Sequence, residues 1–466
     1  MSKKLLFLLM PVLMLLLPIG AIAQGSSIPS IGGIRFEFIL FALTLVSVAL
    51  FHKQTFWVAI IGLTTILIFK FIFDSEFNLF HHFFGENSFN EQIIYKGLRQ
   101  GEWSTILNLL GLLLGFALLA KIFEESGVPD IIPKYLPNDW KGGFVLLVLV
   151  FVLSSFLDNI AAAMIGGTIA LIVFKNKVHI GYIAGIVAAS NAGGSGSVVG
   201  DTTTTMMWIE GVSPLNVVHA YVAAGVALLI VAWFASHQQD KYQRIAKDAK
   251  QGAKIDWGKI IIVGLILIGA ILSNFLYDMP ALGVWIAIII GSFVRKTPWG
   301  EISGAIKGTI FLLCLVTAAS LMPVDDLPSA SWLTAFILGF VSAVFDNIPL
   351  TKLCLEQGCF DWGMLAYTVG FGGSMIWFGS SAGVAITNKF GEARDVFKWI
   401  KYGWHVILAY IVGFFVLYAI IGWEPADNKF VKVARDCNCI EKTNDTIIQT
   451  DSLNVKIKTQ GESQSE

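Results

Sequence analysis

Long runs of apolar residues constrain this sequence more than any other feature, because they exclude folding as a water-soluble domain. An α-helix needs roughly 20 apolar residues to cross about 30 Å of hydrocarbon. Charged residues make up only 14% of the chain, against about 25% in a soluble domain. The sequence therefore predicts an all-α polytopic membrane protein surrounded by lipid. The predicted crossings lie near 35–51, 55–74, 103–124, 180–209, 214–236, 257–276, 279–295, 303–323, 362–390 and 402–422.

The first 23 residues have the composition of a cleaved signal peptide. Lys3 and Lys4 form a basic start, residues 5–17 form an apolar run, and Ala21-Ile22-Ala23 provides a small-x-small cleavage site. The alternative is an uncleaved first helix. Cleavage would leave the mature N-terminus on the periplasmic side of a bacterial inner membrane.

Two further apolar stretches, 142–175 and 332–356, are each interrupted by the tripeptide Asp-Asn-Ile, at Asp158 and at Asp346. A helix of about 14 residues reaches roughly 21 Å, which is too short to cross the hydrocarbon comfortably. We therefore interpret each stretch as a re-entrant hairpin with its Asp-Asn tip inside the membrane. The alternative is a pair of thin crossings joined by a surface turn, since Asp and Asn are ordinary turn residues.

Two motifs recur in the same order in both halves of the chain, which indicates an internal repeat. Ser155 before the first tip matches Ser342 before the second, with one extra residue in the second copy. Further along, each half contains a Gly-Gly-Ser…Gly motif with the same internal spacing, at 193–200 and at 372–379. Runs this rich in glycine disfavour a continuous helix, so each motif predicts a broken crossing.

The predicted layout gives each half five crossings, one of them broken by glycine, and one re-entrant hairpin. An odd number of crossings inverts the second half relative to the first, a recurring design of secondary transporters. Lys and Arg concentrate in the segments that this layout makes cytoplasmic, as the positive-inside rule requires. The predicted segments are a signal peptide at 1–23, a first repeat at 24–236, a cytoplasmic linker at 237–256, a second repeat at 257–423 and a periplasmic polar tail at 424–466.

Aspartates inside the membrane are the main candidates for chemistry, since a carboxylate there is costly and indicates function. Asp158 and Asp346 stand at the hairpin tips, and Asp201 follows the first glycine break. The second break has Ser380 where the first has Asp201, so the predicted site is asymmetric. The alternative role for the tip aspartates is capping of the following half-helix, which is compatible with a role in binding.

The broken crossings expose backbone carbonyls and hydroxyls, which are the oxygen ligands that hard cations prefer. Close carboxylates repel one another, and we expect at least one to hold a proton near neutral pH. A bound cation would displace that proton, and this competition would produce antiport. His219, in the crossing at 214–236, is either a packed, hydrogen-bonded residue or a pH sensor.

These motifs resemble the NhaD-type sodium/proton antiporters, members of an ion transporter superfamily that also contains citrate and dicarboxylate carriers. The resemblance covers about 100 to 410 and is carried by SSFLDNIAAAMIGG (154–167), SNAGGSGSVVGDTTTTMMWI (190–209), SAVFDNIPL (342–350) and GGSMIWFGSSAGVAI (372–386). It implies two inverted repeats, opposed hairpins and a homodimer with moving transport domains. By motif position it implies Na⁺ or proton roles for Asp158, Asn159, Asn191, Asp201, Thr203, Thr204, Ser342, Asp346, Asn347 and Ser380.

One position departs from the pattern that we expect. The second tip has Pro349, whereas Ala161 stands at the corresponding place in the first. We therefore expect a looser geometry at the first tip.

The sequence favours a secondary transporter that exchanges Na⁺ or Li⁺ for H⁺ across the inner membrane, not an enzyme. No CxxC or HExxH motif is present, and we expect no cofactor. A net charge of −1 suggests no nucleic-acid partner. The alternative is a sodium-coupled symporter of citrate, dicarboxylate or another organic anion, although carboxylates at the tips would repel anions. A non-transporting scaffold or sensor is the third possibility.

Overall fold

The computed structural model describes residues 29–426, apart from 32, 52–53, 247–253 and 325–326. The expected signal peptide lies outside the described residues. So does the polar tail beyond 426, with Cys437 and Cys439.

The described residues are almost entirely helical, with one two-stranded hairpin of β1 (Ser30–Ile31) and β2 (Ile34–Arg35). The first half continues with α3 (Phe36–Leu50), α4 (Thr55–Phe73), α5 (Leu79–Phe84), α6 (Phe89–Ile94), η3 (Lys96–Leu98), α7 (Trp103–Glu124), α8 (Val128–Tyr135), α9 (Trp140–Ser154), α10 (Asn159–Val173), α11 (Ile180–Ser195), α12 (Thr202–Ile209), α13 (Leu215–Val218) and α14 (Ala220–Tyr242). The second half contains α15 (Trp257–Tyr277), α16 (Pro280–Val294), α17 (Gly300–Ser320), α18 (Trp332–Ser342), α19 (Asn347–Gln357), α20 (Trp362–Gly372), η5 (Gly373–Met375), α21 (Ser381–Lys389), η6 (Gly391–Arg394), α22 (Val396–Tyr402) and α23 (Trp404–Ile421).

Six helical segments in the described part of the chain are long and apolar enough to cross a membrane: α4, α7, α13–α14, α15, α17 and α23. Five shorter apolar helices accompany them, at α3, α9, α10, α16 and α18. The prediction of an all-α polytopic membrane protein is confirmed. Helix α14 continues to Tyr242, beyond the predicted end of its crossing at 236, because its last turns carry polar residues that do not require hydrocarbon.

The structure contains both predicted Asp-Asn-Ile interruptions and both predicted glycine-rich breaks. Asp158 separates α9 from α10, and Asp346 separates α18 from α19. The run after Ser195 separates α11 from α12, and the run after Met375 separates η5 from α21. The inverted relation of the two halves and the depth of the tips in a membrane stay predictions.

The two Asp-Asn-Ile turns have the same backbone geometry. Asp158 has φ −51° and ψ 142°, and Asp346 has φ −56° and ψ 136°. The expectation of a looser first tip is therefore wrong: side-chain capping by the aspartate fixes the turn without the proline.

The register of the repeat also differs from the predicted one. Helices α9 and α18 end at Ser154 and Ser342, each four residues before its aspartate. The serine that matches Ser342 is therefore Ser154 rather than Ser155, and no extra residue is needed. The sequence comparison chose the wrong member of a Ser-Ser pair, which only the helix ends distinguish.

Close approach of the backbone explains a glycine at each break. A Cβ on Gly193 would collide with the carbonyl oxygen of Phe151, and a Cβ on Gly372 would collide with that of Gly339. Phe151 and Gly339 each lie seven residues before their tip aspartate. Each broken helix is thus packed against the first helix of the hairpin in its own half.

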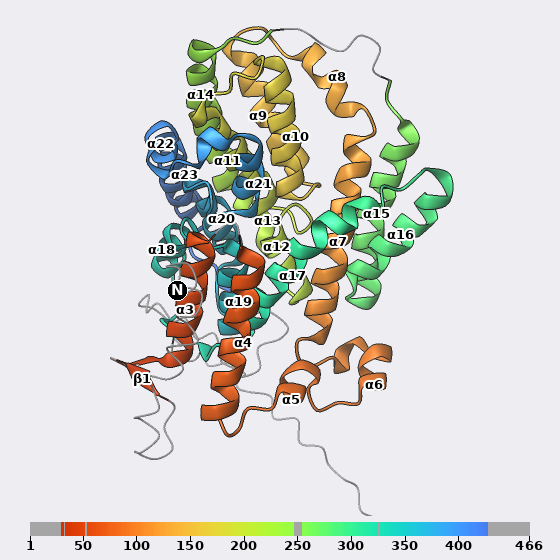
Figure 1. The fold of residues 1–466 in the computed structure, drawn as a ribbon, viewed down its shortest axis with the longest axis vertical. Helices are drawn as coiled ribbons and strands as arrows, with labels where there is room; N and C mark the ends of the chain where they lie inside the picture. Colours follow the sequence, from red (N-terminus) through yellow and green to blue (C-terminus); the bar gives the residue numbers. More distant parts are fainter. Residues whose placement is uncertain (1–28, 32, 52–53, 247–253, 325–326, 427–466) are drawn as a thin grey trace, which may run out of the picture.

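Most helix contacts fall within two groups (Figure 1). The core bundle consists of α9–α14 and α18–α23, and contains both Asp-Asn-Ile turns and both breaks. The outer bundle consists of α3, α4, α7, α15, α16 and α17. The bundles touch where α17 packs against α19, where α10 and α12 meet α7, and at α8.

Candidate functional site

The side chains of Asp158 and Asp346 cap the helices that follow them. One carboxylate oxygen of Asp158 accepts a hydrogen bond from the Ile160 backbone N–H at 3.1 Å. Asp346 accepts the equivalent bond from Ile348 at 3.0 Å. Capping uses one oxygen of each carboxylate, and each residue is only partly buried, so both carboxylates keep acceptor capacity for a ligand.

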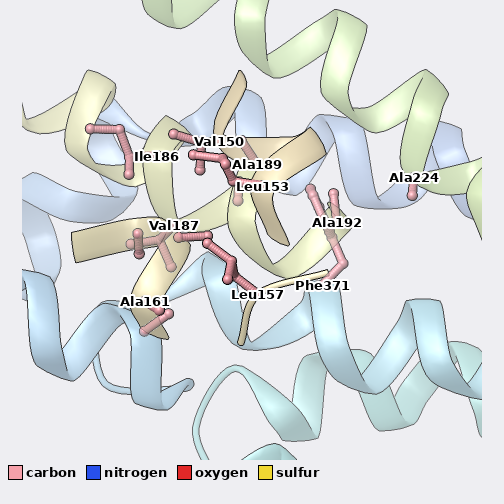
Figure 2. Close-up of a cluster of buried hydrophobic side chains, with 14 of the residues drawn as sticks. Val150, Leu153, Leu157, Ala161, Ile186, Val187, Ala189, Ala192, Ala224 and Phe371 are labelled. Atoms are coloured by element: carbon pink, nitrogen blue, oxygen red, sulfur yellow. The ribbon is translucent and has the colours of Figure 1, made fainter. Parts of the chain in front are cut away.

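Apolar packing holds the first tip in place. Leu157, immediately before Asp158, is fully buried. Figure 2 shows it in a cluster with Leu153 of α9 and Val187 of α11, while Phe371 of α20 contributes from the second half of the chain. The position of Asp158 is therefore fixed by side chains from several helices rather than by the turn alone.

Both tip aspartates line one cavity of about 650 Å³ between the two bundles. The cavity follows α7 from Leu113 to Glu124 and α17 from Leu312 back to Glu301. It therefore runs from the middle of these helices to one end. At that end, which the positive-inside pattern predicts to be cytoplasmic, its charged lining residues are Lys121, Glu124, Glu301 and Lys389.

Behind the cavity, a buried hydrogen-bond network joins the first tip to the first break. The Asn159 amide nitrogen donates to Asp201 at 2.8 Å and to the side-chain oxygen of Asn191 at 3.1 Å. Asn191 in turn donates to the hydroxyl of Ser374 at 2.9 Å. Ser374 belongs to the break in the second half, so the network links both halves of the chain.

Asp201 is almost completely buried at the junction of these elements. Besides Asn159, the hydroxyl of Thr203 donates to it. The backbone of α20 also approaches it closely: a Cβ on Gly370 would lie 3.3 Å from an Asp201 carboxylate oxygen. The residue after it, Thr202, contacts Asp158, so Asp201 lies beside the first tip.

Two neighbouring threonines bind different partners. Thr202 donates to the second carboxylate oxygen of Asp158 at 3.4 Å. Thr204 donates to the backbone oxygens of Ser197 and Asp201, at 2.6 Å and 2.9 Å. Thr204 therefore stabilises the break itself, while Thr202, which the sequence analysis did not select, contacts the tip carboxylate.

The candidate site residues from the second half bind mainly backbone groups rather than one another. Ser342 donates to the backbone oxygen of Val369 at 2.7 Å. Ser380 caps α21 by accepting from the Gly383 N–H at 3.3 Å, and Asn347 is buried in the first turn of α19. The structure thus places Ser342 and Ser380 in backbone-stabilising roles and only Asp346 on the cavity.

The three aspartates do not gather around one point. Within the described ranges, no three His, Cys, Asp or Glu side chains lie close enough together to hold a metal ion. Asp158 and Asp346 face the cavity, whereas Asp201 lies in the hydrogen-bond network. At the inner end of the cavity, a cation would meet the tip carboxylates rather than Asp201.

His219 lies apart from this network. Its Nε2 is 2.7 Å from a carboxylate oxygen of Asp361, which is fully buried and also accepts from the backbone N–H groups of Met364 and Glu424. This pairing is what a packed, hydrogen-bonded histidine requires.

Sequence reasoning missed a buried ion cluster on α19. Lys352 binds Glu102 at 2.8 Å, Glu210 at 2.6 Å and Glu356 at 2.8 Å. A lysine within the apolar stretch at 332–356 was the available signal, because a buried ammonium requires carboxylate partners.

The apolar helices, paired breaks and carboxylate-lined cavity define a polytopic membrane transport protein. A model of the family described as "Citrate transporter" (CitMHS) matches residues 3–358. The chain belongs to this citrate transporter family, so it is a transporter and not an enzyme.

Curated relatives agree with this assignment. Sodium/proton antiporter 1 of Arabidopsis thaliana is 28% identical over 305 residues, covering 56% of this chain and 52% of the relative. Na(+)/H(+) antiporter NhaD of Alkalimonas amylolytica is 26% identical over 346 residues, covering 62% and 69%. NhaD of Vibrio cholerae is 24% identical over 326 residues, covering 57% and 67%. The resemblance to NhaD-type proteins is confirmed, and the match spans about half the length of the Arabidopsis relative.

Proposed function

We propose that the chain is a secondary antiporter that exchanges Na⁺ or Li⁺ for H⁺ by alternating access. The observation that carries the proposal is that Asp158 and Asp346, from different halves, line one cavity that reaches an end of the bundle. Carboxylates attract cations and also bind protons, so a single site can serve both ions. The names of the relatives, which include several sodium/proton antiporters, support the same function.

In this proposal the tip carboxylates receive the cation, and Asp201 supplies charge from behind. Asn159 and Asn191 hold Asp201 in place, with Thr203 donating to it. Thr204, Ser342, Asn347 and Ser380 keep the breaks and half-helices in the geometry that the site needs. When no cation is bound, repulsion between the carboxylates favours protonation of one of them. The transported Na⁺ and H⁺ are the only ligands that the mechanism requires.

We further propose that the two halves, 24–236 and 257–423, are inverted repeats around the linker at 237–256. The equivalent tips and equivalent glycine contacts support this relation. We place the chain in a bacterial inner membrane as a homodimer, with the N-terminus and C-terminal tail periplasmic. Light scattering of the purified protein with its detergent subtracted tests the dimer, and tag accessibility in whole cells tests the orientation.

We propose a regulatory role for His219, because it contacts the fully buried carboxylate of Asp361, which also accepts from two backbone N–H groups. A His219→Gln variant tests this role. Transport with an unchanged pH profile would assign the pair to packing alone.

A sodium-coupled symporter of organic anions is the second candidate, favoured by the description of the family itself. The cavity argues against it, because its inner end presents two carboxylates, which repel an anion. Its charged outer end carries lysines and glutamates alike, so it attracts neither sign exclusively.

Proteoliposomes that contain a pH-sensitive dye and an imposed proton gradient separate the two candidates. Antiport predicts that external Na⁺ or Li⁺ collapses the gradient without any anion substrate, and that citrate has no effect. Accumulation of labelled citrate or succinate driven by a Na⁺ gradient, without Na⁺-driven proton movement, would replace the antiporter by the symporter.

A further inference from the structure

The ion cluster around Lys352 lies at the opposite end of the bundle from the cavity mouth. Glu102 immediately precedes α7, while the cavity opens beside Lys121 and Glu124 near the other end of the same helix. Helix α7 has 22 residues, which separates its ends by about 33 Å. The cluster therefore occupies the end of the bundle away from the mouth of this cavity.

The cluster joins the two bundles. Lys352 and Glu356 belong to α19, and Glu210 follows α12, so these three residues are in the core bundle. Glu102 belongs to the outer bundle. The Lys352–Glu102 contact at 2.8 Å is thus an ion pair between the two bundles, whereas the other two pairs lie within one of them.

Burial makes this pair a strong contact. The side chains of Lys352 and Glu102 are 1% and 5% exposed, so water screens their attraction only weakly. Removing the only partner of a buried charge is strongly unfavourable. Lys352 avoids that cost if the bundles separate, because it keeps Glu210 and Glu356, while Glu102 would gain water at the opened end.

We propose that the Lys352–Glu102 pair is a latch that holds the bundles together at this end and breaks when the pathway opens there. The latch stabilises the conformation described here, with the cavity open at the other end. Neither Lys352 nor Glu102 lines the cavity, so the pair sets the balance between conformations and does not bind the transported ion. The inference rests on the alternating access of the proposed function.

The test measures conformation rather than transport. Gly308 lines the cavity, and a Cβ there would meet no atom within 4 Å, so Gly308→Cys places a thiol in open space. Its labelling by a membrane-impermeant maleimide reports how often the cavity is open. All labelling variants also carry Cys314→Ser. The protein with Cys314→Ser but without Gly308→Cys gives the labelling of the remaining cysteines.

Glu102→Gln is the test variant and Glu210→Gln the matched control, since each removes one carboxylate from Lys352 but only the first lies in the other bundle. We expect Glu102→Gln to shift the equilibrium roughly tenfold away from the open cavity, the factor expected for one charged hydrogen bond, and to slow labelling accordingly. The control should label at the parental rate. If Glu102→Gln does not give a monodisperse protein, the labelling comparison is made between Glu102→Asp and Glu210→Asp instead.

Equal labelling of the Glu102 and Glu210 variants, or faster labelling of Glu102→Gln, would overturn the latch. This readout needs neither Na⁺ nor proton movement. Failure of the antiport assay and failure of the latch are therefore distinguishable.

Discussion

The Asn159 amide nitrogen lies 2.8 Å from a carboxylate oxygen of Asp201, and this bond joins the first hairpin tip to the residue at which the broken crossing resumes as a helix. Asp158, the neighbour of Asn159, faces the cavity. The bond therefore ties the tip that carries Asp158 to the start of α12.

Asp158→Asn and Asp346→Asn separate charge from capping. Asn is about as good an N-cap as Asp, so each variant should keep its half-helix and its melting temperature. The loss of a carboxylate should abolish Na⁺-driven proton movement in proteoliposomes. Normal exchange in both variants would show that the tip charges have no part in transport.

Asp201→Asn tests the buried carboxylate. We expect loss of exchange, because the amide cannot carry the charge that attracts the cation, and because its NH2 group replaces one of the two oxygens that accept from Asn159 and Thr203. Asp240→Asn, which loses a partly exposed pair between Asp240 of α14 and Arg244 just beyond the helix end, is the control and should transport normally. Dye dequenching and thermal unfolding are measured on the same preparations.

Gly193→Ala tests the contact between the broken helix and α9. The added methyl group would overlap the Phe151 carbonyl, and overpacking of this kind costs about 1–3 kcal/mol. Gly225→Ala, in α14 where a Cβ meets nothing within 4 Å, should instead be neutral or stabilising by up to about 1 kcal/mol. Melting temperatures in detergent give the comparison, and equal values for the two variants would contradict the close approach.

Ala161→Pro tests the equivalence of the two tips. Because the first tip already has the backbone of the second, which carries Pro349, the proline should be accommodated. Restriction of the unfolded chain contributes about 0.4–1 kcal/mol of stability, reduced by the loss of the Ala161 backbone N–H, which interacts with the Asp158 carboxylate. A lower melting temperature would show that the two half-helices differ beyond their caps.

The crossings and breaks were predictable because they depend on local properties: the length of an apolar run, an Asp-Asn pair within it, or clustered glycines. The connections within the site were less predictable. Asn191 binds Ser374, a residue 183 positions away, and no local pattern identifies such a partner.

The dependence on contacts between distant parts of the chain also explains the other differences between the predictions and the structure. Ser154 and Ser155 are chemically identical, so the register of the repeat depends on where α9 ends. Lys352 finds its carboxylates on α12 and before α7, and a sequence shows only that a lysine within an apolar stretch needs partners. Ser380 caps α21, as serine at a helix start commonly does, and its role as an ion ligand stays a prediction.

Proton release on cation binding tests the central claim most directly. Purified protein in weakly buffered detergent solution receives NaCl, with choline chloride as the control, and the pH change is recorded for the wild type, Asp158→Asn and Asp201→Asn. Competition for shared carboxylates predicts that Na⁺ releases protons from the wild type and that both variants release fewer or none. Saturable Na⁺ binding by the wild type without any proton release would contradict it.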